Sequence, residues 1–440
     1  MKLILLARSL LVFMLILGGW TLAGCDRVYE TMPYLRPVGN GGVVNLPTPT
    51  VPVQNLVTAT PEPISGDTVT TFTLWLPPEF DPDNGSSEGV LLKQQLEKFS
   101  DDHPEFSLEV RIKAADGAGG LLDTLTTASD VAPAVLPAIL LLPRQDFETA
   151  ASNGLLMKIT DKDFDTSSLD WLPYADQLSK VDGTRYGLPF SGDVLAMAYK
   201  PAQSGIAPST WQEINQKKAV TTFPAADPTA LVPLLFYQAS GGNFGSGGNP
   251  VSLQPDALEA GFLSIADASN AGVFPAWLTE ISSFEQSWQS LLDTRSSYSL
   301  VWVSQYLAEK PQGITLAPVP ASATSAMTFS DGWMVAFPQT SPERFEAYKL
   351  LASYLVDSDF QSAWTNAAGL LPVSQPQFSS WNDSELSGIL LKVIENAQPL
   401  PSSEGTGQIA PLMVQTTIDL LQNKVSYIDA TNMILNTLGE

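Results

Sequence analysis

The chain has 440 residues, of which 22 are lysine or arginine and 46 are aspartate or glutamate, so its formal net charge is −24 at pH 7. Proteins that bind polyanionic nucleic acid use clustered basic side chains to displace its counterions. The charge balance therefore excludes nucleic acid as an expected partner. Hydrophobic residues make up 44% of the chain, which is enough for substantial cores, and the length favours two or more domains.

The N-terminus has the three-part layout of an export signal. Lys2 and Arg8 give it a basic start, residues 10–17 are apolar, and small residues precede Cys25, the one cysteine of the chain. The run Leu22-Ala23-Gly24-Cys25 resembles a bacterial lipobox. This resemblance implies cleavage of residues 1–24, a lipid on the sulfur of Cys25, and an anchor on the outer side of a membrane. An uncleaved transmembrane helix is the alternative, although the apolar run is shorter than the ~20 residues that a spanning helix needs.

Residues 25–68 are rich in Pro, Thr, Val, Gly and Asn, as in Asn45-Leu46-Pro47-Thr48-Pro49. A segment of this composition without apolar periodicity predicts a disordered tether. Such a tether would hold a folded domain away from the membrane. A stalk that binds cell-wall polymer is the alternative interpretation.

From Val69 onward the pattern is that of an α/β fold. In the first helix Leu92, Leu96 and Phe99 share one face, Ser87 is placed to cap its start, and residues 103–104 end it. Further helices are expected around residues 121–128 and from Pro342, which follows Ser341. Short runs rich in β-branched and apolar residues predict strands at 69–76, 106–112, 138–142, 194–199, 298–303, 315–318 and 334–337. The order strand, helix, strand at the start favours a parallel βαβ unit.

Motifs of common enzyme and metal sites are missing. The one histidine, His103, lies beside Pro104 at a helix end and is interpreted as an exposed residue. The glycine-rich run at 241–248 lacks the Gly-Lys-Ser/Thr ending of a phosphate loop. Acidic patches at 81–85 and 161–165 lack the sixth-position Gly and twelfth-position Glu of a calcium loop, so they are interpreted as solvated turns. We expect no cofactor, no metal and no enzyme activity, although a pair of glycosidase carboxylates could still lie far apart in the chain.

Seven segments, in order, resemble the sequence pattern of one family. They are the strand end at Trp75 with its helix and Asp102-His103-Pro104-Glu105-Phe106, then Asn153-Gly154-Leu155-Leu156, Asp182-Gly183-Thr184-Arg185-Tyr186-Gly187-Leu188-Pro189-Phe190, Tyr199-Lys200, Pro208-Ser209-Thr210-Trp211-Gln212-Glu213, Asp331-Gly332-Trp333 and Gly369-Leu370-Leu371-Pro372-Val373. The family is that of the extracellular solute-binding proteins of the family-1 type, the lipid-anchored receptors of ABC importers. The chain departs from the family pattern at 295–306, where a ligand-facing strand is expected, and in the proline-containing loop at 132–137.

The resemblance implies an α/β, two-lobed fold of the periplasmic-binding-protein type II, with the ligand cleft between the lobes. Crossing segments would lie near residues 191–194, 318–320 and 356–360. The first lobe would then comprise 69–192 plus 318–357, and the second 193–317 plus 358–440.

Ligand sites in such folds lie between the lobes, at strand ends and helix starts. Trp75, Trp302 and Trp333 each lie at or near a strand end, where an indole face would suit the C–H face of a sugar. Each tryptophan could equally be a core residue. Asp193, beside Gly192 in an expected crossing, would accept hydrogen bonds from ligand hydroxyls or simply form a turn.

Five further polar residues are candidates for the site. Asp227 precedes Pro228 as a helix N-cap would, and in relatives that helix start faces the cleft. Arg144 follows a buried strand and could pair with an anionic substrate or with Asp146. The remaining candidates are hydrogen-bonding side chains, Asn243, Gln305 and Asp331.

These observations favour a monomeric, lipid-anchored receptor on the extracytoplasmic side of the cell membrane. It would capture a small solute, in particular a mono- or oligosaccharide, by lobe closure and deliver it to the permease of an ABC transporter. One alternative keeps the fold and makes the protein a surface sensor or scaffold without transport. A second alternative is a secreted polysaccharide hydrolase, which would need two acids with separated pKa values in a cleft.

Overall fold

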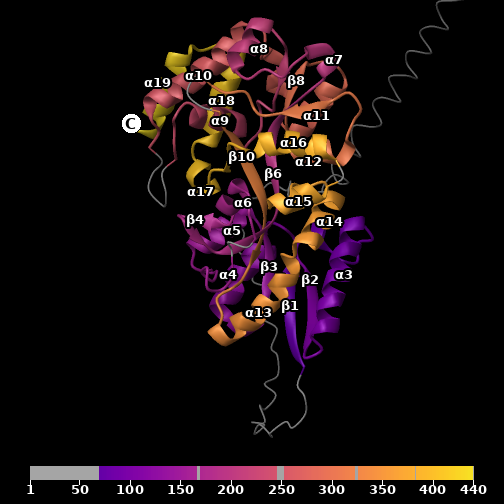
Figure 1. The fold of residues 1–440 in the computed structure, drawn as a ribbon. Coiled ribbons are helices and arrows are strands. Elements are labelled where there is room, and N and C mark those ends of the chain that lie inside the picture. Colours follow the sequence, from indigo (N-terminus) through magenta and orange to yellow (C-terminus); the bar gives the residue numbers. More distant parts are fainter. Residues whose placement is uncertain (1–68, 166–168, 245–251, 323–325, 382, 440) are drawn as a thin grey trace, which may run out of the picture. The chain divides into compact units, whose positions relative to one another are not determined.

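The computed structural model describes residues 69–165, 169–244, 252–322, 326–381 and 383–439. The expected signal peptide, the lipidation site at Cys25 and the tether to residue 68 lie outside the described residues, as does the second half of the glycine-rich run, residues 245–248. The predicted α/β class is confirmed in the part of the chain that the structure describes (Figure 1).

Each predicted strand overlaps a strand of the structure, which also has several short strands that were not predicted. The described strands are β1 (Thr70–Leu76), β2 (Phe106–Ile112), β3 (Ile139–Pro143), β4 (Lys180–Val181), β5 (Thr184–Arg185), β6 (Gly187–Tyr199), β7 (Thr221–Thr222), β8 (Tyr298–Trp302), β9 (Thr315–Ala317), β10 (Thr328–Ala336) and β11 (Ala397–Pro399). Described strands form a nine-stranded sheet of order β2-β1-β3-β10-β6-β8-β7, to which β9 and β11 add beside β6 and β10. The expected parallel βαβ unit is present, because β1 pairs with β2 in parallel.

Helices connect the strands and cover the sheet. In the described chain the α-helices are α3 (Ser87–Asp102), α4 (Leu121–Val131), α5 (Arg144–Ser152), α6 (Pro173–Leu178), α7 (Pro201–Ser204), α8 (Trp211–Lys217), α9 (Leu231–Ala239), α10 (Pro255–Asn270), α11 (Phe284–Leu292), α12 (Val303–Glu309), α13 (Pro342–Leu355), α14 (Ser358–Ala368), α15 (Gln375–Ser380), α16 (Ser384–Ile394), α17 (Ser403–Thr406), α18 (Ala410–Leu421) and α19 (Tyr427–Leu438). Single 3-10 turns are η2 (Pro78–Phe80), η3 (Pro133–Val135) and η4 (Ala276–Glu280).

The capping residues of two helices compare the predicted helix starts with those in the structure. Ser341 caps α13 as predicted, since its side chain accepts from the backbone N–H of Arg344. The expected cap of α3 was one residue off: Ser86, not Ser87, accepts from Gly89 N at 3.0 Å. Ser87 is already helical and its hydroxyl donates to Glu88. Two adjacent serines offer the same capping chemistry, so the sequence alone does not choose between them.

Strand β6 changes its partner along its 13 residues. Residues 187–194 pair antiparallel with β10, whereas residues 195–199 pair antiparallel with β8. The change falls where a crossing segment was predicted, at residues 191–194. The sequence predicted β6 only from residue 194 and β10 only from residue 334, because glycine, proline and aspartate at the crossing are depleted in strands.

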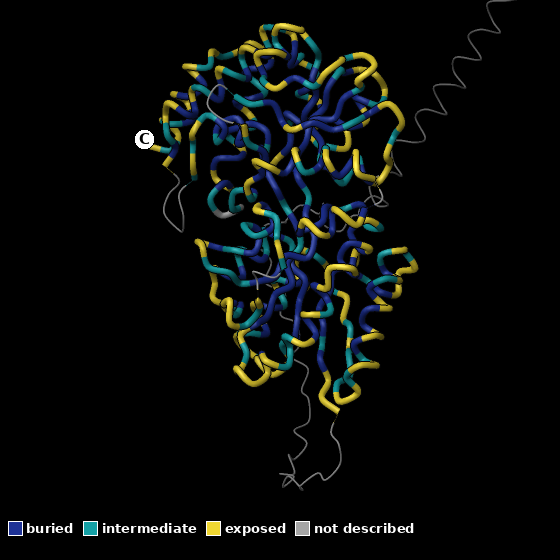
Figure 2. Tube along the Cα trace, in the orientation of Figure 1, coloured by how far each residue is buried: buried dark blue, intermediate teal, exposed yellow. Residues whose placement is uncertain are grey.

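The buried hydrophobic residues of the described chain form three clusters. Figure 2 colours all buried residues dark blue. The α3 cluster contains Phe72, Leu92, Phe99, Phe190, Val335 and Trp364. The α10 cluster contains Leu195, Phe236, Phe262, Leu300 and Phe329. The shared cluster runs along the opposite face of β6 and β10 and contains Leu140, Phe147, Val194, Val301 and Met334.

The distribution of these clusters matches two lobes built on one sheet. On one face of β6 and β10 the shared cluster is continuous, whereas the other face is divided between the α3 and α10 clusters. The lobe boundaries in the sequence stay a prediction. Phe360 and Trp364 of α14 belong to the α3 cluster, which argues for placing the last boundary beyond Ala368.

Candidate functional site

Two aspartates interrupt the hydrophobic face of β6 and β10. On β6, Asp193 separates Phe190 of the α3 cluster from Leu195 of the α10 cluster. On β10, Asp331 lies between Phe329 of the α10 cluster and the half-buried Trp333, which packs against the α3 cluster. Residues two apart in a regular strand share a face. The register shift between Trp333 and Met334 leaves Phe190 as an extra residue of β6, so that Phe190 and Asp193, three apart, lie on one face. Both carboxylates therefore lie where the two clusters part.

The two aspartates are direct cross-strand partners. The antiparallel register pairs Asp193 with Asp331 and Gly192 with Gly332. Directly opposite side chains on antiparallel strands have Cβ atoms ~4.5–5.5 Å apart and point to the same face. The sheet therefore brings together two carboxylates that are 138 positions apart in the printed sequence.

Each carboxylate accepts backbone N–H groups on one oxygen. Oδ1 of Asp193 accepts from Val194 N at 2.8 Å and from Ser304 N at 3.1 Å. Oδ1 of Asp331 accepts from Gly332 N at 2.8 Å. Among the described residues, no backbone N–H donates to Oδ2 of either side chain. The hydroxyl of Ser304 also hydrogen-bonds the Asp193 carboxylate.

The environment favours the protonated form of both acids. Burial, aided by the nearby charge of Asp331, raises the pKa of Asp193 to about 7, although the hydrogen bonds from Ser304 and Val194 act in the opposite direction. Burial also raises the pKa of Asp331, against the effects of Gly332 N–H and Arg144. Two like charges in a poorly solvated position disfavour each other, so the pair resists carrying two negative charges at neutral pH.

Two indoles flank the acid pair. Trp302 ends β8 opposite Leu195, two residues before the Ser304 N–H that binds Asp193. Its ring packs edge-on against Phe284, with centroids 5.9 Å apart, and remains half-buried. The half-buried Trp333 packs edge-on against Phe80 at 5.0 Å. Each indole is thus fixed by an aromatic neighbour and keeps part of its surface accessible.

Gln305 belongs to the same segment, but both ends of its amide are engaged. Its Oε1 accepts from Trp302 N at 3.0 Å, and its Nε2 donates to Glu285 at 3.4 Å. These bonds hold the turn from β8 into α12, which presents Ser304 N to Asp193. The geometry therefore supports a positioning role for Gln305.

Arg144 lies near the pair but faces a different partner. It begins α5 and is 5% exposed, and its Nη2 lies 3.3 Å from Glu148 Oε2. The alternative partner expected from sequence, Asp146, is not the one observed. Residues four apart lie on the same face of a helix, whereas residues two apart do not. Nε and Nη1 of Arg144 have no hydrogen-bond partner in the described chain.

Three predicted ligand residues have other contacts in the structure. Trp75 is 2% exposed within the shared cluster, with the Lys113 ammonium 4.5 Å from its ring centre.

Asp227 is not a helix N-cap, because α9 starts at Leu231 and Ala230 occupies the N-cap position. Its carboxylate instead holds a turn through Thr229 N and Oγ1 at 3.0 and 2.6 Å. Asn243 packs its backbone against Tyr237 and Gln254.

Sequence reasoning missed two parts of this site. The first is Ser304, which hydrogen-bonds Asp193 through its backbone N–H and its hydroxyl. The second is the facing pair Gly192 and Gly332. The sequence contains a signal for this pair. One strand reads Gly192-Asp193 and the other Asp331-Gly332, so glycine faces glycine and aspartate faces aspartate when the strands run antiparallel.

Both glycines are required by close packing. A Cβ on Gly192 would meet the ring of Tyr174, whose hydroxyl donates to Pro372 O at 2.6 Å. A Cβ on Gly332 would meet the carbonyl oxygen of Ser191. The two strands therefore approach neighbouring elements more closely beside the aspartates than any other residue would allow.

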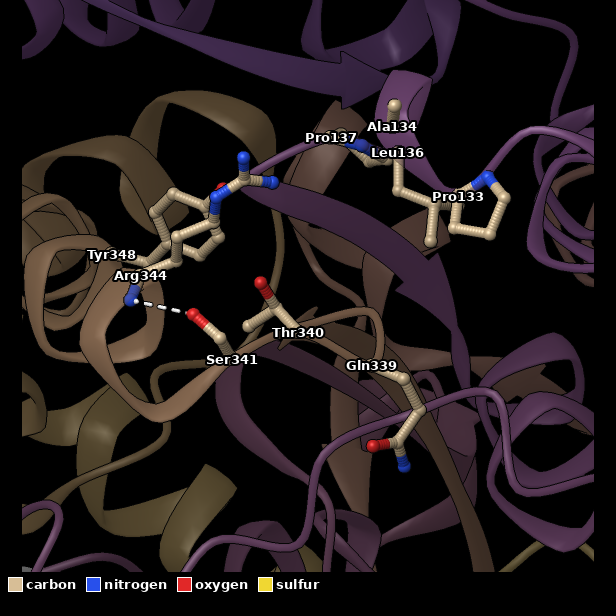
Figure 3. A pocket seen from close by; sticks show the side chains of 9 residues that line it. All are labelled: Pro133, Ala134, Leu136, Pro137, Gln339, Thr340, Ser341, Arg344 and Tyr348. Atoms are coloured by element: carbon tan, nitrogen blue, oxygen red, sulfur yellow. Dashed lines mark hydrogen bonds between the residues drawn. The ribbon is translucent and has the colours of Figure 1, made fainter.

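A separate pocket of about 390 Å³ is lined by the loop that precedes β3 and by the segment from Gln339 into α13 (Figure 3). The loop with Pro133 and Pro137 forms one side, and Arg344 and Tyr348 of α13 form the other. This is the loop that departs from the family pattern.

In the described part of the chain there is no group of three or more His, Cys, Asp or Glu residues that could hold a metal ion. None of the described helices is long and apolar enough to cross a membrane.

Comparison with known proteins identifies the family. A model described as bacterial extracellular solute-binding protein matches residues 94–376. The chain belongs to this family. Members are binding proteins that act outside the cytoplasm, as the description of the family states. No curated protein sequence matches this solute-binding protein.

Solved structures show that the solute-binding protein shares the fold of maltose-binding proteins. Maltose-bound MalE3 of T. maritima is 19% identical, with a TM-score of 0.59 over 84% of this chain and 99% of that chain. The sugar-binding protein MalE of Xanthomonas citri is 17% identical, with a TM-score of 0.66 over 84% and 96%. A solute-binding protein of Thermotoga lettingae bound to α-D-tagatose is 17% identical, with a TM-score of 0.59 over 84% and 98%. The predicted two-lobed architecture is thereby confirmed.

Proposed function

We propose that this solute-binding protein captures a mono- or oligosaccharide at the acid pair and its flanking indoles. The observation that carries the proposal is the register that faces Asp193 with Asp331 between two hydrophobic clusters. Carboxylate oxygens accept hydrogen bonds from sugar hydroxyls, and the accessible faces of Trp302 and Trp333 suit the C–H faces of a pyranose or furanose ring. The sugar ligands of similar structures, maltose and tagatose, support the same class.

Binding by lobe closure follows from where the pair lies. Asp193 lies on the strand that both halves of the sheet share, and its Oδ1 already binds α12 through Ser304 N. A ligand that contacts residues of both lobes would stabilise the closed arrangement by its greater affinity for that arrangement. No bond is made or broken, so the protein acts as a receptor and not as an enzyme.

Transport and anchoring complete the proposal. The lipobox-like run ending in Cys25 and the tether after it would hold the receptor, as a monomer, on the outer face of the cell membrane. The receptor would there deliver its sugar to the transmembrane subunits of an ABC permease. Mass spectrometry of the membrane-extracted protein tests the anchor, because a mature N-terminus at Cys25 with a diacylglycerol adduct is expected. An unmodified N-terminus upstream of residue 25 would contradict it.

The ligand class is tested with residues 65–440, which form a compact unit that contains all described helices and strands. Thermal unfolding and tryptophan fluorescence are followed across mono- and oligosaccharides, polyols, amino acids and phosphates. We expect a saturable shift with one sugar class, since a ligand that binds the folded state must stabilise it. The double variant Asp193→Ala/Asp331→Ala should lose this shift, whereas Asp130→Asn, an exposed carboxylate on α4, should keep it.

Two other outcomes point to the alternatives. A folded protein that responds to no ligand favours the sensor or scaffold. Turnover of a glycan favours the hydrolase, for which two acids with raised pKa values in one place are a specific reason to test. Stoichiometric binding without release of reducing ends excludes the hydrolase.

A further inference from the structure

Neither acid of the pair is in direct contact with a basic side chain. None of the ion pairs within the described residues involves Asp193 or Asp331. The donors that bind the pair are neutral: backbone N–H groups go to Oδ1 of each residue, and the hydroxyl of Ser304 also bonds Asp193. Two directly opposite carboxylates on one face repel each other. A proton held on one of them removes this repulsion.

The groups around the pair do not supply the missing charge. Tyr174 of α6 packs against Gly192 on the opposite face of β6, and burial raises the pKa of its phenol, which keeps it neutral. Asp176 of the same helix is paired with Lys180 and Arg185. Arg144 of α5 acts on Asp331 only through space and is bound to Glu148. The charged residues of α12, α14 and α16 that remain are all exposed, namely Glu309, Asp359, Glu385 and Lys392.

We infer that Asp193 and Asp331 hold one proton between them and bind a neutral hydroxyl group of the ligand as a carboxylic acid beside a carboxylate. This inference rests on the proposed function, because it describes how that site selects its ligand. The acid donates from Oδ2–H to a ligand oxygen, and the carboxylate accepts the ligand O–H. A fully ionised pair would offer acceptors only, and it would repel acidic sugars and sugar phosphates.

Affinity then depends on pH in a definite direction. Once the pair has lost its shared proton, binding must take that proton up from solvent. Each pH unit above the titration of the pair therefore weakens binding about tenfold, whereas affinity is constant below it. With Asp193 titrating at about 7, the dependence falls between pH 7 and pH 9.

The test measures Kd by calorimetry at pH 5.5, 6.5, 7.5 and 8.5, with maltose as the first probe and then any sugar that the thermal screen identifies. Wild type is compared with Asp193→Asn and with Asp130→Asn, which removes an exposed charge elsewhere. In Asp193→Asn, Oδ1 still accepts from Val194 and Ser304, and the amide N–H₂ takes the place of the protonated Oδ2. We expect wild type and Asp130→Asn to bind about tenfold more weakly at pH 8.5 than at pH 7.5, and Asp193→Asn to bind equally at both.

Proton uptake is measured directly by repeating the pH 8.5 titration in phosphate and in Tris, whose ionisation enthalpies differ. A binding enthalpy that differs between the buffers for wild type, and not for Asp193→Asn, supports the inference. A sugar that binds with the same Kd at every pH and the same enthalpy in both buffers overturns the inference and leaves the proposed function standing.

If no sugar binds, the proposed function is wrong, but the proton on the acid pair can still be measured in the free protein. Carbon-13 titration of the aspartate carboxyls, with Asp193→Asn for assignment, reports the proton in the free protein. An aspartate that titrates near neutral pH and disappears in the variant is expected. Titration of both carboxyls below pH 5 overturns the inference whatever the ligand.

Discussion

At the scale of single residues, the site depends on what the backbone does for two carboxylates. Asp193 binds two N–H groups through Oδ1 and faces Asp331 across the strands. Burial of this carboxyl, with a like charge nearby, makes its ionised form unfavourable in the folded state. The same property that suits it to a ligand hydroxyl therefore lowers the stability of the free protein at high pH.

Replacing Asp193 with Asn should stabilise the free protein at pH 8. The folded state holds the Asp193 proton up to about pH 7, whereas the unfolded chain releases it near pH 4. Its contribution to wild-type stability is thus complete below pH 4 and lost as pH rises through 7. We expect the variant to exceed wild type by about 4 kcal/mol at pH 8 and by about 1 kcal/mol at pH 4.5.

Urea unfolding followed by tryptophan fluorescence at the two pH values measures this difference. Asp130→Asn is the control for the loss of one negative charge, and it should change stability by less than about 0.5 kcal/mol at either pH. An Asp193→Asn variant that is less stable than wild type at pH 8 would contradict the expectation.

At the scale of elements, the strands that carry the site are the ones the sequence predicted least completely. The apolar strand β3 and the alternating strand β2 were found from pattern alone, because their residues are typical of strands. The segment around Ser330, Asp331 and Gly332 looks like a loop, yet it lies in a central strand. Pairing with β6, which is remote in sequence, overrides the weak local preference for strand.

Gly332 should be intolerant of a side chain for the same reason. Gly332→Ala places a Cβ against the carbonyl oxygen of Ser191 in the interior of the sheet, and overpacking of this kind costs about 1–3 kcal/mol. Gly388→Ala is a matched control, since a Cβ there meets nothing within 4 Å and Gly388 lies inside helix α16. That control should be more stable than wild type by about 0.5–1 kcal/mol.

Chemical denaturation of both variants measures the effect. Opposite signs for the two glycine substitutions support close approach of β6 and β10 as the cause. Equal destabilisation by both would instead reflect a general intolerance of alanine at glycine positions.

At the scale of the whole molecule, composition predicted the class of protein and not its ligand. The net charge of −24 excluded nucleic acid, and the order of strands and helices predicted the α/β class. The resemblance to solute-binding proteins implied the two-lobed fold that the similar structures confirm. The acid pair could be predicted only in part. Asp193 and Asp331 were separate candidates, and their direct opposition depends on a strand register that a single sequence does not reveal.

The same net charge predicts how the folded protein responds to salt. An excess of 24 negative charges destabilises the compact state through self-repulsion, which added ions screen. Thermal unfolding at pH 8 should therefore show a higher midpoint in 0.5 M than in ~0.02 M NaCl, because the Debye length falls from above ~20 Å to below ~5 Å. The rise should shrink at pH 5, where more carboxyls are protonated. A midpoint that is independent of salt at both pH values would contradict this expectation.

The change of partner within β6 also determines how this protein can be engineered. Residues 187–194 complete one part of the sheet and residues 195–199 complete another, so neither part can be produced as a fragment with all its strands. Dividing the gene near codon 193 would yield two polypeptides with open strand edges, which are prone to aggregate. A fluorescent reporter is better inserted whole at an exposed turn such as residues 116–119, where the polypeptide can be interrupted without removing a strand.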